Sequence, residues 1–126
     1  MADQPKAKIL LIDDDPTLLT TYEMAFSSKG YETIVAHDGA EGLAKATKEK
    51  PDLIIVDLMM PKLDGKQFIE QVRADDTMKD TPIIACTALI EDLEKAPILK
   101  LGATAYVVKT ETDPNKLVKK AESYLK

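Results

Sequence analysis

Four short apolar segments of the chain each run directly into a polar or charged residue. The segments are residues 9–12, 53–56, 83–86 and 106–108, and the residues that follow them are Asp13, Asp57, Thr87 and Lys109. Each segment has the length and the apolar character of a strand that is buried on both faces, as in a parallel sheet covered by helices. Ligands of such sheets bind beyond the carboxyl ends of the strands. The sequence therefore predicts that these side chains converge on one crevice.

Segments with helical spacing lie between the apolar runs, and residues 33–36 form a further predicted strand after the first helix. The predicted order is therefore five strand–helix units. Pro16 suits the first turn of a helix that ends at Gly30, and Asp38 can cap the second helix. Gly102 is a predicted helix C-cap, and Pro114 begins the last helix. Because crossovers between parallel strands are right-handed, helices should cover both faces. The expected fold class is a doubly wound α/β sheet.

Length, charge and cysteine content narrow the class of protein. A chain of 126 residues is expected to form one domain, residues 1–126. A formal net charge of −5 argues against direct binding of nucleic acid by this domain. No apolar stretch approaches the roughly 20 residues of a membrane span, and the single cysteine, Cys86, agrees with a reducing compartment. We therefore expect a cytoplasmic protein with no membrane partner.

The predicted crevice has the composition of a site for a divalent metal and a phosphoryl group. When ionised, Asp13, Asp14 and Asp57 carry three negative charges, and Lys109 carries one positive charge. The remaining charge of −2 matches a Mg²⁺ ion, which prefers oxygen ligands and uses one or two carboxylates together with phosphate oxygens.

In this order and at this spacing, the motif residues resemble those of a response-regulator receiver domain of the CheY-like type. They are Asp13-Asp14, Asp57 within the segment 56–65, Thr87-Ala88 and Lys109. The resemblance covers nearly the whole chain. It implies a flavodoxin-like fold, with a five-stranded parallel sheet of strand order 2-1-3-4-5 and five helices, and a role in two-component signalling.

The resemblance also implies a role for each site residue. Asp57 would accept a phosphoryl group from a histidine kinase or a phosphotransfer protein, as a carboxylate nucleophile. Asp14 and Asp57 would bind Mg²⁺ directly, with the backbone carbonyl of Met59 as a further ligand. Asp13 would act on the metal mainly through a bound water. Lys109 would pair with Asp57 and then with the incoming phosphoryl oxygens.

Two further residues, Thr87 and Tyr106, would form a switch. The Thr87 hydroxyl would donate to the phosphoryl oxygen, and Tyr106 would turn from an outward to an inward rotamer. The surface of the fourth helix, fifth strand and fifth helix would then change, and an unknown downstream protein would bind there. Such a module is no enzyme beyond self-catalysed phosphorylation and dephosphorylation.

Two residues depart from the family pattern. Thr110 follows Lys109 where relatives carry proline, and a cis peptide before a non-proline residue costs about 2.5–4 kcal/mol. We therefore predict a trans Lys109–Thr110 peptide, a rerouted segment 110–112, and a Lys109 ammonium that still reaches Asp57. Pro97 lies within the predicted fourth helix, where it should end one turn and begin a short helix that stops at Gly102.

Two other classes of protein fit part of the pattern. The segment 11–17 also matches a phosphohydrolase of the haloacid dehalogenase type, with Asp13 as nucleophile and Asp15 as general acid. Those enzymes add a larger cap or core and a late acidic pair, whereas the further acid here, Asp57, follows the third strand. A flavin-binding flavodoxin relative fits the fold, but the chain lacks its Ser/Thr/Gly-rich phosphate loop. We assign no chemistry to His37 or Cys86.

Overall fold

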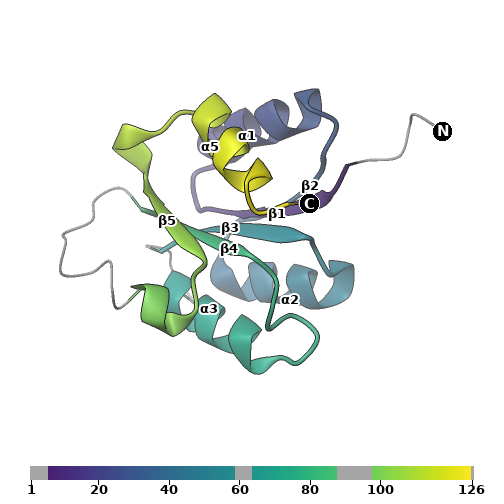
Figure 1. Cartoon of the computed structure of the whole chain (residues 1–126), viewed down its shortest axis with the longest axis vertical. Helices are drawn as coiled ribbons and strands as arrows, with labels where there is room; N and C mark the ends of the chain where they lie inside the picture. The colour runs from purple at the N-terminus through teal and green to yellow at the C-terminus, as the bar shows by residue number, and fades with distance from the viewer. Residues whose placement is uncertain (1–5, 59–63, 88–97, 126) are drawn as a thin grey trace.

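The computed structural model describes residues 6–58, 64–87 and 98–125, and in them five parallel strands form one sheet (Figure 1). The strands are β1 (Lys8–Ile12), β2 (Glu32–Ala36), β3 (Leu53–Asp57), β4 (Ile83–Thr87) and β5 (Ala105–Val108). Their order in the sheet is β2-β1-β3-β4-β5. The predicted doubly wound α/β class and strand order are confirmed.

Helices cover both faces of this sheet. They are α1 (Pro16–Ser28), α2 (Gly39–Glu49), α3 (Gly65–Ala74) and α5 (Pro114–Glu122), and residues 98–101 are also helical. Figure 1 shows α1 and α5 on one face and α2 and α3 on the other. In the described part of the chain, no helix has the length and apolar character needed to span a membrane.

An aspartate side chain caps the N-terminus of each of the helices α1, α2, α3 and α5. Each accepts a hydrogen bond from a backbone N–H of the first turn, and the four caps are Asp15, Asp38, Asp64 and Asp113. The predicted helix starts at Pro16 and Pro114 are confirmed. Because α1 begins three residues after Asp13, the capping turn fixes the path of the acidic segment at the carboxyl end of β1.

Two hydrophobic clusters fill the layers above and below the sheet. Alternate residues of β1 enter each layer, with Leu10 packed against the α2 and α3 side and Leu11 against the α1 and α5 side. Phe68 on α3 and Phe26 on α1 are fully buried in these layers. Burial of each such side chain contributes about 1.5–3 kcal/mol. The central strands β1, β3 and β4 are therefore buried on both faces, as their sequence predicts. The prediction is wrong for β5, an edge strand in which buried and half-buried residues alternate.

The segment after β5 confirms the predicted trans peptide between Lys109 and Thr110. No cis peptide occurs among the described residues, so the Lys109–Thr110 bond is trans, and Lys109–Glu111 form a short 3₁₀ turn (η1). Gly102 has a φ of +120°, as expected of a residue at a helix C-terminus. Pro97 lies outside the described residues, and so does the break in the helix predicted there.

Candidate functional site

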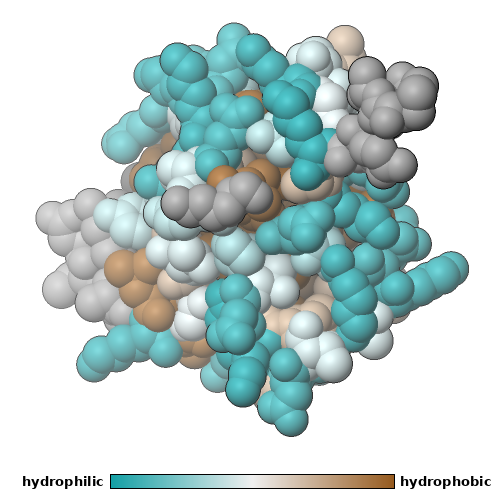
Figure 2. Space-filling view, turned by 45° about the vertical axis from the view of Figure 1, so that its right-hand side comes forward, coloured by the Kyte–Doolittle hydropathy of each residue, from teal (hydrophilic) through white to brown (hydrophobic). Residues whose placement is uncertain are grey.

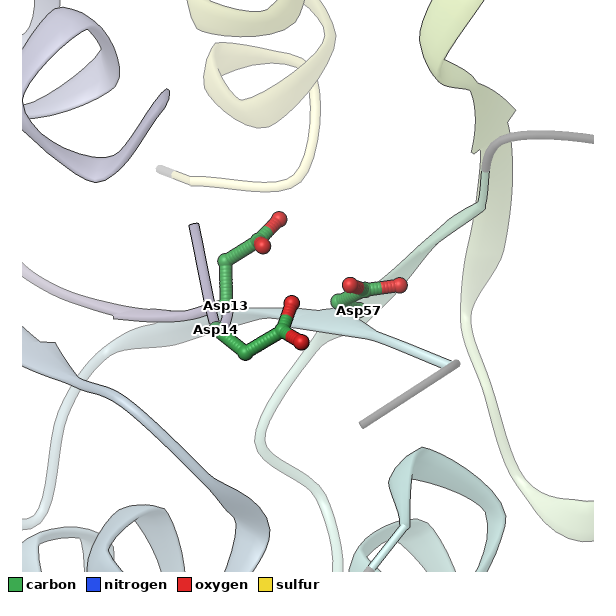
Figure 3. A group of neighbouring side chains, drawn as sticks. All are labelled: Asp13, Asp14 and Asp57. Atoms are coloured by element: carbon green, nitrogen blue, oxygen red, sulfur yellow. The ribbon is translucent and has the colours of Figure 1, made fainter. Parts of the chain in front are cut away.

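Three carboxylates meet where β1 and β3 end. Asp13 and Asp14 follow β1, and Asp57 is the last residue of β3, its neighbour in the sheet. One carboxylate oxygen from each lies within 4.8 Å of the others (Figure 3). Asp13 and Asp57 are buried, whereas Asp14 is exposed. The site therefore combines two enclosed anions with one that solvent reaches.

Lys109 joins this cluster from the far side of β4. Its Nζ lies 2.7 Å from Asp13 Oδ2 and 3.2 Å from Asp57 Oδ2. Burial disfavours the charged ammonium, but the hydrogen bond to Asp13 and the charges of Asp13 and Asp57 outweigh that cost. The pKa of Lys109 is raised as a result. The lysine is therefore a fixed cation between two buried carboxylates, as its predicted position requires.

Both oxygens of Asp13 accept hydrogen bonds within the protein. Oδ1 accepts from the Asp15 backbone N–H at 3.0 Å, and Oδ2 accepts from Lys109. Figure 3 shows the Asp14 carboxylate extending from the end of β1 toward Asp57. These contacts engage both carboxylate oxygens of Asp13. A set of three carboxylates is the hard oxygen donor set that Mg²⁺ takes, so the residues fit that ion.

The structure also positions Thr87 and Tyr106. Asp57 pairs in register with Cys86, so the buried Thr87 ends β4 one residue further along the strand. Tyr106 lies on β5 opposite Ala85 and is half-buried against the α2 and α3 layer. The register thus places the Thr87 backbone beside the end of β3. Met59, whose carbonyl is a predicted metal ligand, lies outside the described residues.

Gly65 lies close to the backbone of Asp57. The sequence pattern alone did not explain why a glycine occupies this position. A Cβ atom on Gly65 would lie 2.5 Å from the Asp57 carbonyl oxygen and 2.6 Å from Leu58 Cα. Because both neighbours are backbone atoms, no side-chain movement could relieve this contact. A glycine at position 65 is therefore needed for α3 to begin so close to Asp57.

Tyr22 on α1 and Cys86 on β4 are both buried on the α1 side of the sheet, in the same hydrophobic cluster. Burial and then the neighbouring Cys86 raise the pKa of Tyr22, and Asp13 and Asp57 add to that rise. Burial raises the pKa of the Cys86 thiol to about 12, so the thiol stays protonated and unreactive at neutral pH. Sequence patterns gave no signal for this pair, since the two residues meet only through packing of α1 on β4.

Residues 9–122 match the family model described as "Response regulator receiver domain". Among curated proteins, the chain is 43% identical over 102 residues to the alkaline phosphatase synthesis transcriptional regulatory protein PhoP of Bacillus subtilis, covering 81% of this chain and 42% of that protein. It is 41% identical to the probable transcriptional regulator ycf27 of Guillardia theta, covering 84% of this chain and 41% of that protein. The chain spans about two fifths of the length of these relatives.

Solved structures agree with this match. The chemotaxis response regulator CheY4 of Vibrio cholerae superposes with a TM-score of 0.88 at 35% identity, covering 94% of this chain and 98% of that one. The BeF3-activated N-terminal receiver domain of Klebsiella pneumoniae RstA gives a TM-score of 0.86 at 28% identity, again covering 94% and 98% of the two chains.

Proposed function

The chain belongs to the response regulator receiver domain family, and we propose that its Asp57 is the phosphoacceptor of a two-component signalling system. One observation carries this proposal. Asp57 is a buried carboxylate held by Lys109, with the exposed Asp14 beside it. A buried carboxylate beside a fixed cation, in a cluster whose oxygens can bind a divalent metal, is suited to receive an anionic phosphoryl group.

The proposed reaction is a transfer between two proteins. An Asp57 carboxylate oxygen attacks the phosphorus of a phosphohistidine, whose nitrogen–phosphorus bond breaks as the oxygen–phosphorus bond forms. The nitrogen keeps the electron pair and takes a proton from solvent, and Asp57 becomes an acyl phosphate. Lys109 stabilises the transferred oxygens as a point charge, and Asp13 holds that ammonium in place.

We propose that Asp14 and Asp57 bind Mg²⁺ directly, with the carbonyl of Met59 as a further ligand and Asp13 acting through water. When bound, the ion neutralises the negative charge of the carboxylates and the phosphoryl oxygens. This chain's own contribution is the geometry of the carboxylates. The capping turn at Asp15 fixes the backbone that carries Asp13 and Asp14, and β3 carries Asp57.

The proposed response is a change of partner rather than a new reaction. The Thr87 hydroxyl donates to a phosphoryl oxygen once Asp57 is modified, and Tyr106 then changes rotamer. The affected surface consists of the predicted fourth helix, β5 and α5, where a downstream protein binds. Residues 98–101 are the part of that helix that the structure describes. Residues 1–126 act as one receiver domain, and its only catalysis is of its own phosphorylation and dephosphorylation. The cytoplasm, where two-component kinases present phosphohistidine, is its proposed location.

Incubation with Mg²⁺ and acetyl phosphate tests the proposal. We expect intact-mass analysis to show one added phosphoryl group, and peptide analysis to place it on the segment that contains Asp57. Chelation of Mg²⁺ should prevent labelling, whereas Asp76→Asn, a control at an exposed loop aspartate, should leave it unchanged. A label on Asp13 would instead support the phosphohydrolase alternative.

A further inference from the structure

β2 is an edge strand of the sheet, and alternate residues direct their backbone groups outward from it. The Glu32 N–H donates to the Ala7 carbonyl at 2.9 Å, and the Ala36 carbonyl accepts from the Asp13 N–H at 3.1 Å. Glu32 and Ala36 therefore face β1. Because the direction of the backbone groups alternates along a strand, Val35 faces outward, and so do the residues two before and two after it.

Side chains of α2 occupy two of these outward groups. Lys45 Nζ donates to the Val35 carbonyl at 2.6 Å, and Glu41 Oε1 accepts from the His37 N–H at 2.7 Å. Glu41 Oε2 also lies 3.0 Å from Lys45 Nζ, and its Oε1 lies 3.1 Å from His37 Nδ1. His37, Glu41 and Lys45, spaced four residues apart, thus form one connected set at the carboxyl half of β2, which we call the edge clasp.

The strand beneath the edge clasp would otherwise suit strand addition. Its sequence, Glu32–Ala36, contains Thr, Ile and Val in succession, which are residues that favour strands, and it carries one charge. Its outward backbone groups are those that a further strand would use, and exposed strand edges promote pairing between copies. A second copy of β2 is the partner that always shares its length and sequence.

We propose that the edge clasp prevents β2 from pairing with β2 of a second copy of this chain. A pairing strand would have to displace Lys45 from the Val35 carbonyl and Glu41 from the His37 N–H, and would cover both charged side chains. Removal of the edge clasp converts the β2 edge into a self-association surface. This role does not depend on phosphorylation of Asp57.

The lowered pKa of the Glu41 carboxyl group is consistent with its short contacts to His37 and Lys45. The backbone hydrogen bond from His37 and the contact with Lys45 lower it to about 2. Glu41 therefore stays ionised, and the edge clasp stays charged, throughout the neutral and mildly acidic range.

The test compares the Glu41→Ala, Lys45→Met double variant with the parent chain by sedimentation velocity over a concentration series. The matched control is Lys48→Met, which removes an exposed lysine from the same helix. We expect the parent and the control to stay monomeric. The double variant should dimerise, with a dissociation constant at least tenfold below any weak self-association of the parent chain. Exchange of the Val35 backbone amide hydrogen should be slower in that dimer than in the monomer.

Two results would overturn the proposal. One is a folded double variant that remains monomeric over the concentration range of the parent, and the other is a parent chain that already dimerises through β2. If the double variant does not fold, Lys45→Met alone gives the same comparison, because it keeps the Glu41 contact with His37. Dimerisation of Lys45→Met supports the proposal, and a folded monomer contradicts it.

Discussion

Lys109 and Asp57 are 52 residues apart in sequence, yet Lys109 Nζ lies 3.2 Å from Asp57 Oδ2. The parallel topology accounts for this proximity, because β3 and β5 both end at the same edge of the sheet with β4 between them. The long lysine stem crosses the end of β4 and also reaches Asp13. One cation therefore holds two buried carboxylates, and the consequences of its removal can be measured.

Lys109→Met should abolish labelling by acetyl phosphate and lower the free energy of unfolding by roughly 1–3 kcal/mol. The loss of stability follows because Asp13 and Asp57 would remain buried without their cation; the cost stays below that of a fully buried pair because solvent still reaches the site. Urea unfolding of the parent and the variant measures this change in the free energy of unfolding. The same substitution in an Asp57→Asn background should cost less stability, since only one carboxylate then lacks a partner. Equal costs in the two backgrounds would contradict the shared contact.

Asp14→Ala should weaken Mg²⁺ binding by tenfold or more and slow labelling in proportion. With one carboxylate fewer, the ion keeps more of its own water and is held less strongly. Isothermal titration calorimetry measures the affinity, with Asp76→Ala as the control at an exposed aspartate outside the cluster. An unchanged Mg²⁺ affinity in Asp14→Ala would show that the metal site has been placed wrongly.

Thr87→Val should separate phosphorylation from its readout. Valine keeps the shape of the buried side chain but removes the hydroxyl, so Asp57 should still be labelled while the Tyr106 ring no longer changes environment. NMR spectra of ¹³C-labelled tyrosine, recorded before and after addition of acetyl phosphate, distinguish the two effects. A full Tyr106 response in the valine variant would remove Thr87 from the proposed switch.

Tyr31→Phe should change how stability depends on alkaline pH. Burial, and then the hydrogen bond from the Tyr31 hydroxyl to Glu122 at 2.8 Å, raise the pKa of Tyr31 from 10.0 to about 12. The folded state therefore keeps a proton that the unfolded state loses above pH 10, so this contribution is complete below pH 10 and is lost as the pH rises to 12. Urea midpoints of the parent should approach those of the variant across that interval. A constant difference would contradict the assignment.

The sequence could predict whatever depends on local pattern. The apolar runs located the strands, and Pro16 and Pro114 marked helix starts. The strands' carboxyl ends then gave the residues of the site. Contacts that depend on how one helix or strand packs against another could not be predicted from the sequence. Lys45 reaches Val35 only because α2 packs beside the edge of β2.

Gly102 illustrates the same limit. Its place after a helix was predictable, and its positive φ explains the glycine in part. A Cβ there would also lie 2.6 Å from Arg73 Cγ, and Arg73 Nε donates to the Gly102 carbonyl at 2.8 Å. This second reason comes from α3, whose C-terminal turn meets residue 102 only in the folded sheet.

The most direct test of the central claim identifies the modified residue chemically. Borohydride reduces an acyl phosphate to an alcohol, so a phosphorylated aspartate becomes homoserine, which peptide mass spectrometry can locate. After treatment with Mg²⁺ and acetyl phosphate followed by borohydride, we predict homoserine at position 57 and an unchanged Asp57→Asn variant. Homoserine at position 13, or none in the phosphorylated parent chain, would contradict Asp57 as the phosphoacceptor.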